Sequence, residues 1–183
     1  MKKFLQFSGL IAAVIAIASF ILLLTCPALV YSSGFTDPVS IAGVDAIFGK
    51  VKVSSTTILG AQVSATVYNA TPSAIIAFVL LIVAMVVLIF GALLPILKIK
   101  ALNKFAGLLN LIAVITLVVA GILVFIEVPC FCAAQSTENI TVSTDGYSLG
   151  AGWTISGILA IVAGVLAIAP TFADFLAKGK KRK

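Results

Sequence analysis

The sequence predicts an all-α membrane protein, a four-transmembrane-helix bundle with a small antiparallel β-sheet formed by its outer loops. Of the 183 residues, 62% are hydrophobic and 10% are charged, and the mean hydropathy is +1.27. A soluble domain is about half apolar and one-quarter charged. Charged residues are missing from four long segments, and the polar stretches between them alternate as strands do. We therefore exclude a water-soluble fold and expect a single integral membrane domain over residues 1–183.

Four charge-free segments are long enough to cross a bilayer. An ionised side chain near the bilayer centre costs at least ~2.5 kcal/mol, and about 20 helical residues cross the ~30 Å hydrocarbon core. The segments hold 20 to 24 residues each. We expect transmembrane helices at about 5–24, 74–97, 105–126 and 152–173.

The basic residues predict the orientation of the helices. All twelve Lys and Arg residues except Lys50 and Lys52 flank the helices on the side of the two termini. All six acids except Asp174 lie in the other two loops, at about 26–73 and 127–151. The positive-inside rule then places both termini in the cytoplasm and these two loops outside. The expected location is the cell (cytoplasmic) membrane, which the chain crosses several times.

A basic tail, 174–183, follows the last predicted helix. Each basic residue near an anionic leaflet contributes ~1 kcal/mol to membrane binding, so the tail is expected to bind anionic lipid headgroups at the cytoplasmic face. Nucleic-acid binding is the competing use of a basic run, but membrane tethering already accounts for these residues. No nucleic-acid partner is expected. The cations of the tail are Lys178, Lys180, Lys181, Arg182 and Lys183.

The outer loops carry strand patterns. In the first, residues 50–54 and 61–67 alternate apolar and polar residues, and 55–60 is expected to join them as a hairpin loop. In the second, 139–143 alternates likewise, and Asp145-Gly146 is a tight-turn signal. A lone hairpin is marginal in water, so strands from both loops are expected to pair. Mobile polar loops are the alternative.

Small residues share faces of the predicted helices. Such spacing lets helix backbones approach closely where the hydrophobic effect cannot drive association. Packing within the bundle is favoured, and an oligomer interface is the alternative. Asn110 is expected to hydrogen-bond across helices, a contribution of ~1 kcal/mol. The residues assigned to helix packing are Gly9, Ala13 and Ala16 in the first helix and Ser156, Ala160 and Gly164 in the fourth.

The three cysteines follow the first and third predicted helices at similar depth. Cys26 is expected to reach Cys130 or Cys132 and form a disulfide in an oxidising compartment; three unpaired thiols are the alternative. A bond between Cys130 and Cys132 would close a strained small ring. A cleaved lipoprotein-type signal before Cys26 is disfavoured, because the apolar core exceeds the usual length of about 7–15 residues and Thr25 is not a small residue.

The inventory of chemical groups argues against catalysis. The chain has no histidine, and without histidine or an intramembrane carboxylate no pair of nucleophile and base can be assembled. Thiol-redox membrane enzymes need Cys-x-x-Cys, whereas this chain has Cys-x-Cys. Glu127 lies at the outer edge of a span and is interpreted as a solvated interfacial acid rather than a coupling site. No catalytic, cofactor-binding or metal-ligating residue is expected, and hence no enzyme.

Two families share features with this chain. Four helices with inner termini and a long first outer loop resemble claudins and peripheral myelin-type proteins in topology alone, since the first loop lacks their tryptophan-rich stretch and cysteine pair. Residues 1–4, 44–49 and 147–152 are similar to those of small uncharacterised four-helix membrane proteins of low-GC Gram-positive bacteria. This second resemblance implies a bacterial cytoplasmic-membrane protein of unknown activity and few structural disulfides.

Two classes of function fit these expectations. The first is a non-catalytic membrane protein, namely a scaffold, adhesion element or accessory subunit that recognises a second copy of itself or another membrane protein through its outer loops and helix faces. The alternative is a pore or transporter for a neutral or hydrophobic solute, since ion coupling ordinarily needs buried charges. A membrane thiol-redox enzyme comes third. The uniformly apolar spans favour the first class.

Overall fold

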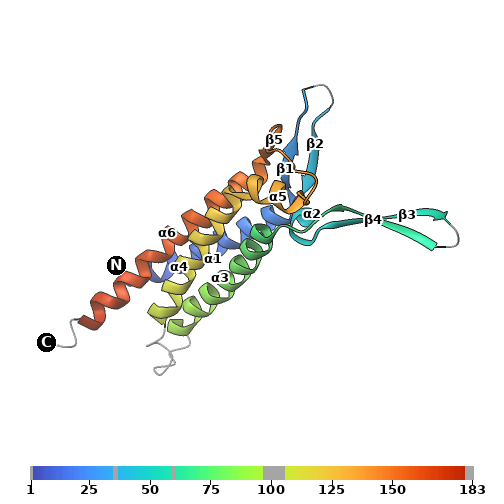
Figure 1. Ribbon diagram of the computed structural model, residues 1–183. Helices are drawn as coiled ribbons and strands as arrows, with labels where there is room; N and C mark the ends of the chain where they lie inside the picture. The colour runs from blue at the N-terminus through green and yellow to red at the C-terminus, as the bar shows by residue number, and fades with distance from the viewer. Residues whose placement is uncertain (1, 35–36, 59–60, 97–105, 180–183) are drawn as a thin grey trace.

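The computed structural model describes residues 2–34, 37–58, 61–96 and 106–179. Four long helices form a bundle, and segments of 18 to 20 residues within them are long and apolar enough to cross a membrane. The four predicted helices are confirmed as helices, although the last continues beyond its predicted end, into the predicted tail. The helices are α1 (Lys2–Thr25), α3 (Pro72–Ile96), α4 (Ala106–Phe125) and α6 (Ala151–Gly179) (Figure 1).

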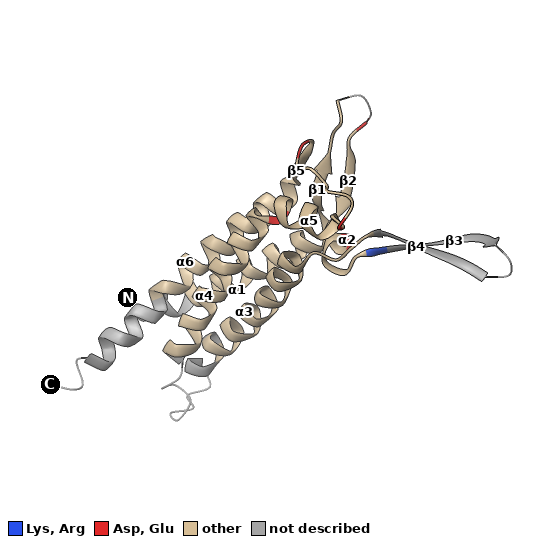
Figure 2. Ribbon diagram, in the orientation of Figure 1, with Lys and Arg blue, Asp and Glu red and all other residues tan. Residues whose placement is uncertain are grey.

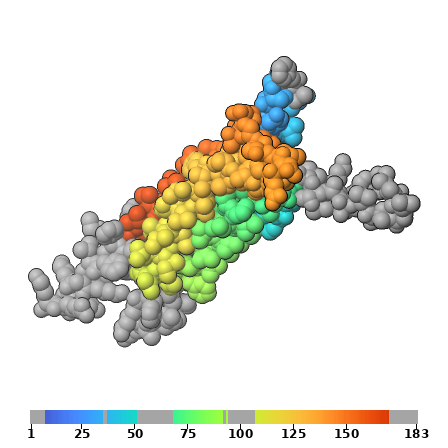
Figure 3. All heavy atoms as spheres, viewed as in Figure 1, coloured from blue at the N-terminus to red at the C-terminus, as the bar shows by residue number. Residues whose placement is uncertain are grey.

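Each long helix packs against two neighbours. Both α1 and α4 contact α3 and α6, so all neighbouring helices are antiparallel. Alanines fill the interior, and large apolar side chains such as Val14, Ile115 and Val165 face outward. In the space-filling view, the described parts of α3, α4 and α6 form one continuous face (Figure 3). Small residues inside and large apolar residues outside suit a bundle surrounded by lipid.

The charged residues whose side chains the structure describes gather at one end of the bundle (Figure 2). We call this end, which carries all the β-strands and the short helices α2 (Gly43–Phe48) and α5 (Glu127–Gln135), the sheet end. Both termini lie toward the opposite end (Figure 1). The backbone of Lys178 belongs to α6, whereas Lys180, Lys181, Arg182 and Lys183 of the predicted basic tail lie outside the described residues.

A three-stranded antiparallel sheet caps the bundle in the order β2-β1-β5. Its strands are β1 (Pro27–Tyr31), β2 (Val39–Ala42) and β5 (Tyr147–Leu149). Strands from both predicted outer loops therefore pair, as expected. The participants differ from the prediction, because β1 and β2 come from a part of the first loop that has no clear alternation. The predicted turn at Gly146 leads into β5 with a positive φ of 81°.

A second sheet consists of the hairpin β3 (Lys50–Ile58) and β4 (Ala61–Tyr68). The sequence predicted this hairpin, although its strands are longer than expected and 55–58 belongs to β3 instead of the loop. The hairpin does not join the other sheet. It extends away from the helices as an arm (Figure 1).

The prediction of a strand at 139–143 is wrong. Only an isolated bridge, Thr137 to Ile140, forms in this stretch. The hydroxyl of Ser136 accepts a hydrogen bond from the Val142 N–H at 3.0 Å, and that of Ser143 accepts one from the Asp145 N–H at 3.1 Å. Serine hydroxyls thus take backbone partners that a strand would need, which favours turns.

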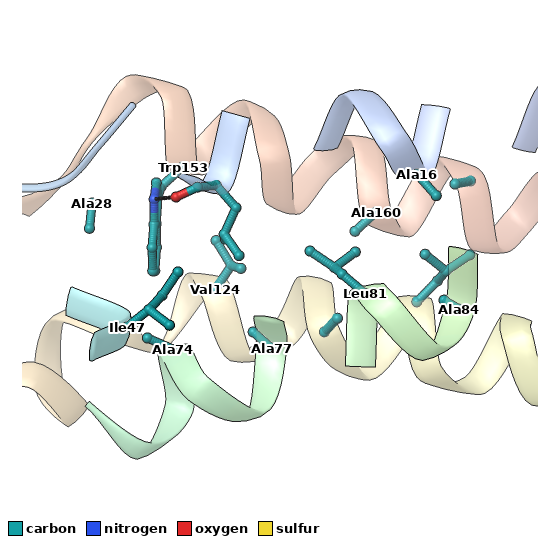
Figure 4. Close-up of a cluster of buried hydrophobic side chains, with 14 of the residues drawn as sticks. Ala16, Ala28, Ile47, Ala74, Ala77, Leu81, Ala84, Val124, Trp153 and Ala160 are labelled. Carbon is teal, nitrogen blue, oxygen red and sulfur yellow. Dashed lines mark hydrogen bonds between the residues drawn. The ribbon is translucent and has the colours of Figure 1, made fainter. Parts of the chain in front are cut away.

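Trp153 closes the core at the sheet end. Its side chain is fully buried in α6, and its indole N–H donates to the main-chain carbonyl oxygen of Leu23 at 2.8 Å. Figure 4 shows the ring between Ala28 and Ile47, with the hydrogen bond as a dashed line. Gly43 lies against the same carbonyl oxygen, where a Cβ atom would overlap it. The start of α2, the end of α1 and α6 are thereby fixed to one another.

Candidate functional site

Helix α5 is one of the elements of the sheet end that the sequence did not predict. It follows α4 almost directly and packs against α3, α4 and β5. Pro129 lies in its first turn, where a missing N–H removes no helical hydrogen bond. The first turn of α5 therefore tolerates Pro129, although this stretch was predicted to be part of the second outer loop.

Glu127, at the start of α5, is fully buried. Its Oε2 atom accepts a hydrogen bond of 2.6 Å from the hydroxyl of Ser73, in the first turn of α3. The prediction that Glu127 is a solvated interfacial acid is therefore wrong, because α5 folds against α3 and removes the carboxyl group from water. No sequence signal distinguishes a buried glutamate from a solvated one at the edge of a span.

Two polar atoms beside this contact have no hydrogen-bond partner. They are Glu127 Oε1 and the hydroxyl oxygen of Thr71, the fully buried residue that precedes α3. Thr71 lies close enough to stabilise the carboxylate electrostatically, as Ser73 does, but not in hydrogen-bond geometry. Buried polar groups are nearly always paired, so two unpaired atoms at one place mark an unusual site.

The electrostatics of Glu127 are set by burial. Loss of solvent raises the pKa of Glu127 to about 7, while the hydroxyls of Ser73 and Thr71 act in the opposite direction. Among the described side chains the one salt bridge is that of Lys50 with Asp45, at 2.9 Å, so no described cation pairs with Glu127. A buried, unpaired carboxyl group binds a proton more readily than a solvated one.

The far end of α5 is held by a second set of hydrogen bonds. The side-chain oxygen of Gln135 accepts from the Asn69 N–H at 2.8 Å, and its amide nitrogen donates to the Asn69 carbonyl at 2.9 Å. The Asn69 side chain donates to the Ala134 carbonyl at 3.1 Å. The segment 69–73 is thus attached to α5 at both ends, through Asn69 at one and Ser73 at the other.

A row of aromatic rings links α5 to both sheets. Phe131 is fully buried and lies with its ring centroid 5.9 Å from those of Tyr68 and Tyr147. Tyr147 in turn lies 4.8 Å from Tyr31 across the β1–β5 pair. Contacts of this kind stabilise by ~0.5–1.5 kcal/mol each beyond area burial. Displacement of α5 would therefore disturb the base of the hairpin and the three-stranded sheet together.

The residues predicted for helix packing lie mostly at helix contacts. Ala13, Ala16 and Ala160 are at most 4% exposed, and a Cβ at Gly164 would lie 3.1 Å from Val118. Gly9 is buried, but a Cβ there would meet no atom within 4 Å among those the structure describes.

Ser156 does more than pack. Its hydroxyl donates to the Ser19 carbonyl at 2.8 Å, and the Ser19 hydroxyl donates to the Ser156 carbonyl at 2.9 Å. The sequence analysis missed Ser19, although it lies three residues beyond Ala16 on the face already singled out.

Two close approaches join α4 to its neighbours. A Cβ at Gly121 would lie 2.9 Å from the Gly157 carbonyl oxygen in α6. A Cβ at Gly91 in α3 would lie 2.6 Å from Oδ1 of Asn110. Asn110 thus packs across helices, against the backbone of Gly91.

The three cysteines are free thiols in the structure. Cys26 lies against Gly152, where a Cβ would be 2.6 Å from its sulfur, and the Cys132 thiol donates to the Ser143 carbonyl at 3.5 Å. Cys130 is half-buried on α5. The disulfide between Cys26 and Cys130 or Cys132 stays a prediction. No group of three or more His, Cys, Asp or Glu residues that could hold a metal occurs among the described residues.

Four apolar helices of membrane-spanning length, capped at one end by two small sheets, are compatible with a multi-pass integral membrane protein. In comparisons with known proteins, no family model and no curated protein matches the sequence.

Proposed function

We propose that the protein is a non-catalytic membrane component, a scaffold, adhesion element or accessory subunit. It binds a second copy or another membrane protein through its sheet end and its helix faces. The observation that carries this proposal is the β3–β4 hairpin, which extends from the bundle as an arm (Figure 1).

The base of the arm is firmly held. Lys50 forms an ion pair of 2.9 Å with Asp45 of α2, and the ring of Tyr68 packs on Phe131 of α5. Gly49, with a positive φ of 76°, turns the chain from α2 into β3. A fixed base limits the directions in which the arm can extend, which lowers the entropic cost of binding.

Among the described strands, β3 and β4 pair only with each other. The arm is a two-stranded sheet, so β3 and β4 are both edge strands with one row of backbone groups unpaired within the sheet. Two strands alone are marginally stable in water. A partner that adds a strand, or covers the arm, would supply the missing contacts.

The interior of the bundle gives less support to the alternative, a pore or transporter for a neutral solute. Thr116 is one of the few polar residues in mid-helix, and its hydroxyl donates to its own helix, with the Ile112 and Ala113 carbonyls both at 3.0 Å. Asn110 lies against Gly91. The Thr116 hydroxyl is therefore not free to replace water around a passing solute.

The orientation belongs to the same proposal. We place the sheet end outside the cytoplasmic membrane of a bacterial cell, with the basic residues at the cytoplasmic face in contact with anionic lipids. The charge bias of the loops supports this orientation. The resemblance to four-helix proteins of low-GC Gram-positive bacteria supports the host membrane.

The test removes the arm and leaves its base. Residues 51–67 are replaced by a two-residue Asn-Gly turn, and complexes of the tagged full chain and of this variant are isolated in mild detergent. The full chain is expected to elute as a homo-oligomer or with a stoichiometric membrane-protein partner, and the variant as a monomer with unchanged helix content. Replacement of exposed Val14 by Ala, on the lipid-facing side of α1, is the control. Complexes of identical composition with and without the arm would contradict the proposal.

A further inference from the structure

We propose that Glu127, Ser73 and Thr71 form a proton-binding site whose occupancy controls the docking of α5 on the start of α3. This inference goes beyond the proposed function and does not depend on the identity of any partner. It rests on a fully buried carboxyl group, on two unpaired buried oxygens beside each other, and on the way in which α5 is attached.

A bound proton satisfies both unpaired atoms. A carboxylate can only accept hydrogen bonds, whereas a protonated carboxyl group has one O–H donor. With the proton on Oε1, Glu127 donates to the Thr71 hydroxyl oxygen after a small side-chain adjustment, and Oε2 still accepts from Ser73 at 2.6 Å. The ionised form can pair the same two atoms, because the Thr71 hydroxyl can donate to Oε1. Only the protonated form pairs them without burying a net charge.

Release of the proton makes the docked arrangement costly. A buried carboxylate without a cation partner pays a desolvation penalty that water would remove. Glu127 belongs to α5, and its carboxyl group is buried where α5 lies against α3. Water therefore reaches this group when α5 separates from α3. The same motion breaks the Asn69 to Gln135 hydrogen bonds and moves Phe131 out of the aromatic row.

Few other titratable groups face Glu127. The described side chains of α3 and α4 include none, β5 contributes Tyr147, and β4 contributes Tyr68. On α5 itself the remaining titratable groups are Cys130 and Cys132. Asp45 and Lys50, on α2 and β3, neutralise each other. The titration of Glu127 is therefore set by burial and by the two hydroxyls.

The sign of the pH dependence follows from burial. The pKa of docked Glu127 is about 7, against an ordinary 4.5, so the docked state holds a proton that the undocked state releases. Docking is strongest below pH 4.5, weakens as the pH rises from about 4.5 to about 7, and is constant above. This linkage predicts an increase of roughly 30-fold in the undocking equilibrium constant between pH 5.5 and 8.

The experiment measures the exposure of Cys132, which is 2% exposed on α5 in the docked state. The reduced full chain in mild detergent reacts with 4,4′-dithiodipyridine at several pH values, and mass spectrometry of peptides gives the rate for each cysteine. At each pH, the Cys132 rate of the unmodified chain is divided by the Cys132 rate of Glu127→Gln. This ratio cancels the pH dependence of thiol chemistry. The glutamine side chain of this variant keeps both hydrogen-bond roles of the protonated acid but cannot ionise.

The expected result is a ratio that rises roughly 30-fold from pH 5.5 to 8 and levels off above about pH 7. Glu138→Gln, at an exposed position, removes the same charge and is expected to follow the unmodified chain. If Glu127→Gln fails to fold, Cys26 in the unmodified chain becomes the reference, and Ser73→Ala is expected to move the end of the rise to higher pH. A ratio that stays constant over this range, or a Ser73→Ala profile that does not move, overturns the proposal.

Discussion

Ser19 in α1 and Ser156 in α6 each donate a hydroxyl hydrogen to the other residue's main-chain carbonyl oxygen, at 2.9 and 2.8 Å. Their hydroxyl oxygens lie 3.0 Å apart. The pair is fully buried, so the first and last helices of the bundle are joined by a reciprocal polar contact in addition to the hydrogen bond from Trp153 to Leu23.

Replacement of either serine by alanine is expected to lower the free energy of unfolding by ~1 kcal/mol, the usual contribution of such contacts in membrane proteins. The double variant should lower the free energy of unfolding by less than the sum of the two single variants, because the two hydroxyls act as one unit. Denaturation in mixed micelles measures both quantities. Thr116→Ala is the control, since that hydroxyl donates within its own helix and its loss should have a smaller effect. Additive costs for Ser19 and Ser156 would contradict this account.

Gly43→Ala is expected to destabilise the sheet end. A Cβ there would overlap the Leu23 carbonyl oxygen and lie 2.7 Å from the Trp153 indole nitrogen, and backbone atoms cannot yield as a flexible side chain can. We expect the free energy of unfolding to fall by ~3 kcal/mol or more, because the overpacking also breaks a buried hydrogen bond. Thermal unfolding followed by Trp153 fluorescence, the chain having one tryptophan, provides the measurement.

Gly9→Ala is the matched control for Gly43→Ala. A Cβ at Gly9 meets no described atom within 4 Å, and alanine is favoured over glycine inside a helix by ~1 kcal/mol. Unchanged or slightly higher stability is expected. A loss at Gly9 as large as that at Gly43 would show that the sequence-based assignment of Gly9 to close packing is right after all.

The long helices could be predicted because they follow from composition. A charged side chain inside a bilayer is costly wherever it lies, so the absence of charge marks a span without knowledge of its neighbours. The hairpin β3–β4 could be predicted for a similar reason, since alternation is a local property of the chain.

The site could not be predicted because its features arise from tertiary contact. The burial of Glu127 depends on Ser73, which is 54 residues away in sequence. Strand β1 exists because β2 and β5 pair with its two edges, and its own sequence shows no strict alternation. The stretch 139–143 alternates but forms turns, because the Ser136 hydroxyl takes the Val142 N–H and the Ser143 hydroxyl takes the Asp145 N–H just beyond the stretch.

The orientation of the bundle is a separate prediction. Cysteines introduced as Ser55→Cys and Thr144→Cys, in a background without the native three, are expected to react with an impermeant thiol reagent in intact cells. Lys181→Cys should react only after permeabilisation, because the positive-inside rule places the basic residues in the cytoplasm. The reverse pattern, or opposite sides for the two termini, would contradict the four-span topology.

An oxidised preparation is expected to contain an intrachain disulfide from Cys26 to Cys130 or Cys132. Of these two, Cys130 is the expected partner, because burial raises the pKa of the Cys132 thiol and so lowers its reactivity. Intact mass after alkylation without reduction distinguishes the outcomes. One alkylated cysteine supports the bridge, whereas three show that no disulfide forms.

The choice between assembly and transport is decided by two sets of variants. Gly164→Leu is expected to disrupt the α4–α6 contact, because a Cβ at Gly164 already lies 3.1 Å from Val118. Ala160→Leu is expected to overpack the interior of the bundle, where Ala160 is 1% exposed. Overpacking of this kind costs ~1–3 kcal/mol per site. Loss of the complex that the full chain forms in mild detergent is the expected readout.

Asn110→Ala and Thr116→Ala are expected to leave that complex intact, since Thr116 is bonded within its own helix and Asn110 lies inside the bundle, against Gly91. A transporter predicts the opposite pattern, because these two residues supply most of the mid-helix polarity that a neutral solute could contact. The purified chain in liposomes is tested for solute-driven volume change and for ion conductance, with the Ala160→Leu variant beside it. We expect no flux above empty liposomes in any sample. Substantial flux that Asn110→Ala abolishes, with assembly unchanged, would replace the scaffold by a transporter.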